Sequence, residues 1–141
     1  MQEKSKIRWH WVFMIGFGST VLFVLCHVLF VAYYSYLMNP GQEVAHYGEF
    51  AQFTGPPFVA FFGPLPLFLA LRWIGRKAPD RAYLHAVLYI AVSFMIEIVV
   101  TYLAGQPEAL FTWAGFVAEF ATDAGALAGA WTARKEVSSS L

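Results

Sequence analysis

Charged residues are scarce in this sequence. Only 13% of its 141 residues are Asp, Glu, Lys or Arg, and 59% are hydrophobic, whereas a soluble domain carries about 25% charged residues. The apolar residues also leave no polar face at helical spacing, as they would in a soluble helix. The composition therefore excludes an ordinary soluble domain and predicts a protein whose surroundings are the lipid bilayer.

Cysteine and the common catalytic motifs are also lacking. The one cysteine, Cys26, cannot form an internal disulfide or a C-x-x-C site. The sequence has no G-x-x-x-x-G-K, H-E-x-x-H or G-x-S-x-G motif. Nucleotide-binding, zincin-type protease and hydrolase functions therefore have no support, and nothing in the sequence favours an enzyme over a non-enzyme.

The hydrophobic residues gather in four blocks, at about 11–38, 51–74, 82–104 and 110–133. A helix needs about 20 residues to cross a hydrocarbon core, and each block is long enough. The sequence therefore predicts one domain, residues 1–141, folded as an all-α bundle of four transmembrane helices.

All nine basic residues fall on one side of these blocks, before the first, around the second loop and after the fourth: Lys4, Lys6, Arg8, Arg72, Arg76, Lys77, Arg81, Arg134 and Lys135. The first and third loops hold Glu43, Glu49 and Glu108 instead. The positive-inside rule then predicts a plasma or bacterial inner membrane protein with both termini in the cytoplasm. We interpret the basic residues as this topology signal and as contacts with anionic headgroups, not as a nucleic-acid surface.

Prolines interrupt the second block. We expect an outer loop at 41–53 and a helix start at Thr54, where threonine can cap and Pro56 and Pro57 fit the first turn. Gly63, Pro64 and Pro66 then lie near the middle of the span, where proline removes amide donors and kinks a helix. These three residues are a predicted hinge, either a packing kink or a break at a binding site.

Three acids lie inside the predicted spans. Glu119 and Asp123 share one face of the fourth span, and Glu97 lies between Ser93 and Thr101 on the third. No Lys or Arg lies between Tyr83 and Ala133, and a carboxylate at mid-bilayer costs about 2.5–3.5 kcal/mol or more. We therefore expect the acids to be protonated, bound to a cation or turned toward a wet cavity.

Counting from the centre of each span, His27 on the first span lies within about 10 Å of the same depth as these acids. The cluster of His27, Glu97, Glu119 and Asp123 then has four possible roles. It could bind protons and a substrate, or a divalent metal such as zinc, iron or manganese. It could serve acid–base chemistry on a lipid, or it could be polar residues that only hold the helices together.

Small residues form a second stripe on the fourth span, at Ala121, Gly125 and Gly129. Such a stripe lets another helix approach closely, either within the bundle or from a second copy. We expect a homodimer, with this stripe as the candidate contact, or a subunit of a larger membrane complex.

No cofactor is predicted from the sequence. His10 and His85, near the cytoplasmic edge, are a weak candidate pair of haem ligands. The leading hypothesis is a small membrane transport protein that moves a small solute or cation through the carboxylate cluster. The alternatives are an accessory subunit or lipid- or quinone-binding module of a larger complex, and a membrane enzyme or metal-binding protein that uses the same acids and His27.

Overall fold

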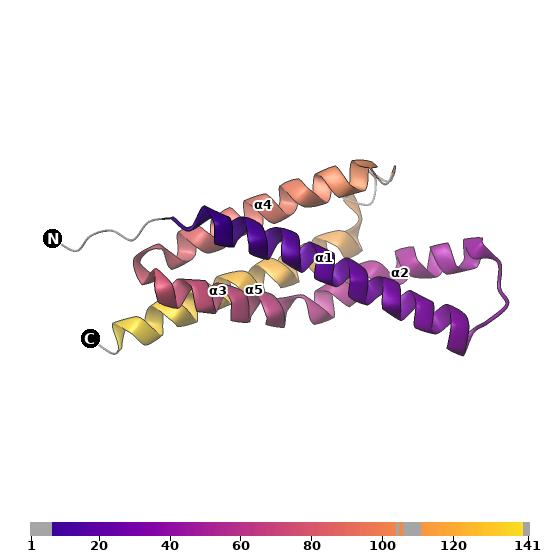
Figure 1. Ribbon diagram of the computed structural model, residues 1–141, viewed down its shortest axis with the longest axis horizontal. Helices are drawn as coiled ribbons and strands as arrows, with labels where there is room; N and C mark the ends of the chain where they lie inside the picture. Colours follow the sequence, from indigo (N-terminus) through magenta and orange to yellow (C-terminus); the bar gives the residue numbers. More distant parts are fainter. Residues whose placement is uncertain (1–6, 104, 106–110, 140–141) are drawn as a thin grey trace.

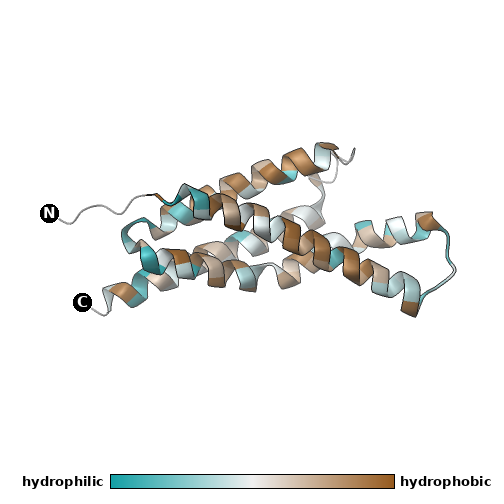
Figure 2. Ribbon diagram, viewed as in Figure 1, coloured by the Kyte–Doolittle hydropathy of each residue, from teal (hydrophilic) through white to brown (hydrophobic). Residues whose placement is uncertain are grey.

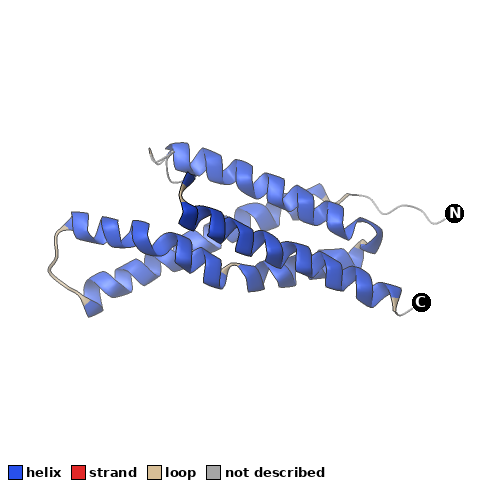
Figure 3. Ribbon diagram, turned by 180° about the vertical axis from the view of Figure 1, so that it is seen from behind, coloured by secondary structure: helices blue, strands red, loops and turns tan. Residues whose placement is uncertain are grey.

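The secondary structure of the chain is helical. A computed structural model describes residues 7–103, 105 and 111–139, and these ranges contain no strand (Figure 3). Five α-helices follow one another (Figure 1): α1 Trp9–Tyr33, α2 Val44–Phe62, α3 Pro64–Lys77, α4 Ala82–Leu103 and α5 Trp113–Ser138. A π-helical segment, Tyr34–Met38, extends α1, and a 3₁₀ turn, Pro79–Arg81, precedes α4. The all-helical prediction is confirmed for these residues.

Two helical segments are long and apolar enough to cross a membrane. They are Trp9–Met38, with 30 residues, and Pro79–Leu103, with 25. Figure 2 shows hydrophobic residues, in brown, over most of α1 and α4. Helices α2 and α3 pass the same test as a pair, although they are bent by 42° where they meet. The chain is therefore an integral membrane protein with two or three candidate spans.

Helix α5, which corresponds to the predicted span at 110–133, is not apolar enough to count among these candidates. Its 26 residues exceed the length of a span, but many are Ala or Gly and two are acidic. The face that α5 turns toward the other helices consists of small residues, and the residues it buries are Ala118, Thr122, Gly125, Ala126, Gly129, Ala130 and Ala133.

Glycines bring α5 into backbone contact with α3. A Cβ added at Gly125 would overlap the backbone of Pro64, and one added at Gly129 would overlap the backbone of Phe68. The close approach buries Leu67 and Leu71 of α3. The predicted stripe is thus covered inside the chain, and Gly125 and Gly129 leave no free surface for the expected contact with a second copy. Ala121 is partly exposed.

Helix α2 begins ten residues earlier than expected, so the loop predicted at 41–53 is wrong. The helix starts at Val44, after a turn in which Gly41 has φ +84°. The extra turns of α2 pack against the end of α1, where the rings of Tyr34 and Phe50 stack 3.7 Å apart and Tyr47 donates a hydrogen bond to the Asn39 carbonyl. These aromatic contacts extend the helix beyond its predicted start.

The bend between α2 and α3 falls at Gly63, with Pro64 as the first residue of α3. The kink predicted from the prolines is confirmed at this position. A Cβ at Gly63 would overlap the Thr122 side chain, so the bend lies directly against α5. Pro56 and Pro57, in contrast, lie inside a continuous α2.

The start of α1, the end of α5 and the turn from α3 to α4 lie at one end of the bundle (Figure 1). Arg72 and Arg76 of α3 both pair with Glu136 of α5 there. Hydrogen bonds from these two guanidinium groups hold the pKa of Glu136 below its ordinary value. The described basic residues therefore gather at this end. The predicted third loop, which holds Glu108, lies outside the described residues except for Gly105, which has φ +70°.

Candidate functional site

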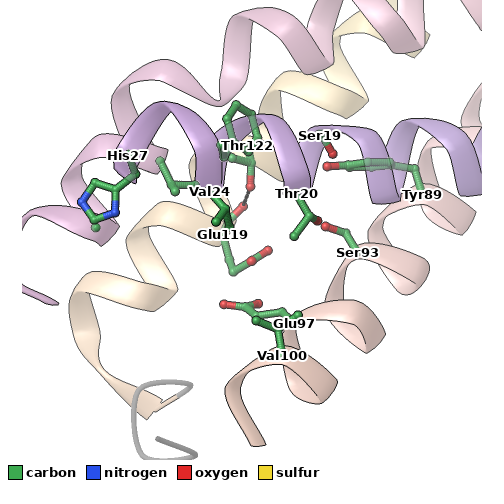
Figure 4. A pocket seen from close by; sticks show the side chains of 13 residues that line it. Ser19, Thr20, Val24, His27, Tyr89, Ser93, Glu97, Val100, Glu119 and Thr122 are labelled. Carbon is green, nitrogen blue, oxygen red and sulfur yellow. Dashed lines mark hydrogen bonds between the residues drawn. The ribbon is translucent and has the colours of Figure 1, made fainter. Parts of the chain in front are cut away.

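A cavity of about 240 Å³ lies among α1, α2, α4 and α5 (Figure 4). Apolar residues of α1, α2 and α4 form part of its wall, and the polar side chains that line it are Ser19, Thr20, His27, Tyr89, Ser93, Glu97, Glu119 and Thr122. Three of the four predicted site residues therefore line one space. Four separate helices contribute to it, so a change in helix packing would change its shape.

Two carboxyl groups face each other in this cavity. Glu97 projects from α4 and Glu119 from α5 (Figure 4), and their carboxyl groups are within hydrogen-bond reach. An ionised carboxylate only accepts hydrogen bonds, so a bond between the two requires a proton on one of them. Oε2 of Glu97 is buried and has no hydrogen-bond partner among the described residues. A pair in this arrangement can hold a shared proton or a cation.

Asp123 lies on the other side of this pair. It lines a separate hollow of about 170 Å³ between α4 and α5, and it does not line the larger cavity. Glu97 and Glu119 line both spaces. The two glutamates therefore form the wall between the cavity and the hollow, with Asp123 one helical turn beyond Glu119.

His27 reaches the cavity from α1. Its Nε2 lies 3.1 Å from Oγ1 of Thr54, and that hydroxyl donates its own proton to the Phe50 carbonyl at 2.8 Å. The imidazole must then be the donor, so Nε2 carries a hydrogen and Nδ1 is left as an acceptor. The ring also packs against Phe58, with centroids 5.4 Å apart. His27 is thus held by α2.

The structure does not assemble the predicted metal ligands. The described residues contain no group of three or more His, Cys, Asp and Glu side chains that could hold a metal ion. Asp123 faces the hollow while His27 faces the cavity. The four residues therefore do not share a coordination centre.

Tyr89 is a site residue that the sequence analysis missed. Its side chain is 3% exposed and forms hydrogen bonds with Ser19 of α1 and Ser93 of α4 at the end of the cavity nearest the start of α4 (Figure 4). Tyr89 precedes Ser93 by four residues, so it extends the stripe of Ser93, Glu97 and Thr101 toward the start of α4. The spacing was visible in the sequence, but a tyrosine among so many aromatics did not stand out.

The hinge lies next to this site. Gly63 packs against Thr122, whose hydroxyl donates to the carbonyl of Glu119 at 2.8 Å. Thr122 also lines the cavity. A change of the bend between α2 and α3 would therefore press on the turn of α5 that carries Glu119.

His10 and His85 do not form a haem site. His85 is fully buried, its Nδ1 donates to the Arg81 carbonyl at 2.9 Å and its Nε2 accepts from the Arg8 amide at 3.1 Å. Both ring nitrogens are therefore engaged in tying the start of α1 to the start of α4, while His10 is exposed.

No family model, curated protein or solved structure matches the chain, so its function has to be argued from the chemistry of this site.

Proposed function

We propose that this protein is a small membrane transport protein that exchanges protons for a small solute or cation at Glu97 and Glu119. The observation that carries the proposal is that these two carboxyl groups form the shared wall of two spaces, the cavity and the hollow. The two glutamates can therefore be reached from two separate spaces, as a carrier that binds its ion from each side in turn requires. The proposal includes a four-span topology, in which α2 and α3 form one bent span and α5 the last, with the basic end in the cytoplasm.

The charge of the pair supplies the coupling. With one proton shared between them, the two carboxyl groups carry a single negative charge. Loss of that proton leaves two facing carboxylates in a site whose lining contains no Lys or Arg, and such a pair is stable only with a cation beside it. One monovalent cation can therefore enter as one proton leaves, and the total charge of the occupied site stays the same.

Access from each side in turn needs a part that moves. The bend at Gly63 supports this role, because α2 lines the cavity through Gly55 and Val59 while Gly63 contacts α5 at Thr122. Opening or closing the bend changes the α2 wall and shifts the turn next to Glu119. Hinges at broken helices near the membrane midplane are a known basis of alternating access.

Reconstituted vesicles test the proposal. Purified protein is placed in vesicles that hold a pH-sensitive dye and an acidic interior, and Na⁺, K⁺ or tetramethylammonium is added outside in separate runs. Cation entry in exchange for protons should make the interior more alkaline with the wild type and not with Glu119→Gln. Glu43→Gln, which removes an acid at the start of α2 outside the site, should behave as wild type. Equal alkalinisation with the wild type and Glu119→Gln, or none with any of the cations, would contradict proton–cation exchange.

One observation favours the second function, an accessory subunit of a larger membrane complex. The hollow that holds Asp123 is flanked by Phe94 and Phe116, whose side chains are more than half exposed. A partner helix over this face would shield Asp123 from hydrocarbon. The intact mass of the protein, released from its own membrane in mild detergent, separates the two functions, because a subunit would carry other chains with it.

A further inference from the structure

A second, larger space lies on the outside of the bundle, between α1 and α4. It has a volume of about 640 Å³ and is walled by Trp9, Phe13 and Phe17 of α1 and by Leu88, Met95 and Val99 of α4, among other apolar residues. Its lining contains no charged side chain and no hydroxyl group. Such a groove takes hydrocarbon and offers no bond to a polar ligand or to water.

The groove has the length of one leaflet. The lining of α4 runs from Leu88 to Val100, which at about 1.5 Å per residue is about 18 Å. Half of a hydrocarbon core is about 15 Å. The two helices touch along its floor, where a Cβ on Gly16 would lie 3.1 Å from Cγ1 of Val92. The groove is therefore closed at the back and open to the membrane.

One end of the groove reaches the basic end of the bundle. Trp9 lines it, and Arg8 is the preceding residue. The Arg8 amide is fixed by its hydrogen bond to His85, so the start of α1 is held against α4. Arg8 therefore immediately precedes the first residue of the apolar lining.

Arg8 differs from the other described basic residues. Arg72 and Arg76 pair with Glu136, and Arg81 lies 4.0 Å from Asp80. The three others lie over aromatic rings: Lys77 over Trp73, Arg134 over Tyr83 and Lys135 over Trp131. Within the described part of the chain, the Arg8 guanidinium has neither kind of partner. A positive charge at the mouth of an apolar groove is complementary to an anionic headgroup with a hydrocarbon tail.

We propose that this groove, formed by α1 and α4, binds one anionic phospholipid from the leaflet at the basic end. An acyl chain lies along Phe13, Phe17 and Met95, and Arg8 pairs with the phosphate. A neutral lipid or a quinone tail fills the apolar part equally well but leaves Arg8 unpaired. The inference does not depend on the transport proposal, because none of the acids of the site lines the groove.

Native mass spectrometry measures this binding. Delipidated full-length protein in mild detergent is titrated with phosphatidylglycerol and, separately, with phosphatidylcholine that has the same acyl chains. We expect a one-lipid complex that is richer in phosphatidylglycerol. Arg8→Gln should lower the bound phosphatidylglycerol by about fivefold, the effect of one basic residue next to an anionic lipid, and should leave phosphatidylcholine unchanged.

Two further variants locate the site. Arg134→Gln removes the same charge at the same end of the bundle but away from the groove, and it should bind as wild type. Ala91→Phe fills the groove and should lower the binding of both lipids, while a melting curve shows that the variant is folded. Equal losses in Arg8→Gln and Arg134→Gln would overturn the site, and equal binding of the two lipids to the wild type would overturn its selectivity for an anionic headgroup.

Discussion

The carboxyl groups of Glu97 and Glu119 lie within hydrogen-bond reach of each other, although they belong to different helices of the bundle. No Lys or Arg lies between Tyr83 and Ala133, so neither α4 nor the part of α5 before Arg134 offers a Lys or Arg that could neutralise them. Two facing carboxylates without a proton or a cation would repel each other in a site with little water. The position of this pair is therefore itself an argument that it holds a small positive ion, of which the proton is the simplest.

A shared proton has a spectroscopic signature. At neutral pH the wild type, in vesicles without other cations, should show the infrared carbonyl band of a protonated carboxyl group. Glu119→Gln and Glu97→Gln should each lose it, because a glutamine amide donates to the remaining carboxylate and replaces the proton. Glu43→Gln is the control and should keep the band. A band that persists in both single variants would show that the pair does not hold the proton.

The glycines of α5 should be intolerant of a single methyl group. Gly129→Ala places a Cβ against the Phe68 carbonyl, and overpacking of this kind costs about 1–3 kcal/mol. Gly18→Ala is the matched control, because a Cβ there meets nothing within 4 Å, and it should cause no loss. Unfolding by denaturant titration in detergent compares the two. Equal stability of both variants would mean that α3 and α5 do not pack as closely as described.

The all-helical fold and part of the candidate site could be predicted from the sequence. The hydrophobic blocks locate α1 and α4 well, because a long apolar run has few alternatives to a membrane helix. The sequence grouped His27, Glu97 and Glu119, and these three side chains line one cavity. The break at Gly63 followed from proline chemistry alone.

Other features depend on contacts that a single sequence does not reveal. The sequence predicts that α2 starts at Thr54, because residues 41–53 have the polar composition of a loop. In the structure, stacking of Phe50 on Tyr34 stabilises the helix before that point. The glycine stripe could equally have faced a second copy, and only the position of α3 decides that it does not. Asp123 shares a helix face with Glu119, yet it lines only the hollow, whereas Glu119 also lines the cavity.

Restoring an amide at the hinge should straighten the second span. Pro64→Ala provides the N–H that the Ala60 carbonyl lacks, so the 42° bend should decrease. In a Cys26→Ser background, spin labels at positions 48 and 69 would report a longer mean distance in Pro64→Ala than in the parent. Pro57→Ala should leave the distance unchanged, because α2 is already continuous there. An unchanged distance in Pro64→Ala would show that packing of Gly63 against Thr122, and not the missing amide, sets the bend.

The ion pairs at the basic end should make stability depend on pH. Hydrogen bonds from Arg72 and Arg76 hold the pKa of Glu136 below its ordinary value of 4.5. A carboxyl group whose pKa is lower in the folded state stabilises the protein above the unfolded value, and it loses this contribution as the pH falls through the lower, folded value. The melting temperature of the wild type should therefore exceed that of Glu136→Gln at about pH 7, and the difference should shrink on acidification below about pH 4.

High salt should also reduce this difference in melting temperature, because the ion pairs are partly exposed and their charges are screened. Arg72→Gln removes the pair from the other side and should reproduce the loss at neutral pH. A difference between wild type and Glu136→Gln that is constant from pH 7 to pH 3 would mean that shape, and not charge, links α3 to α5 at this end.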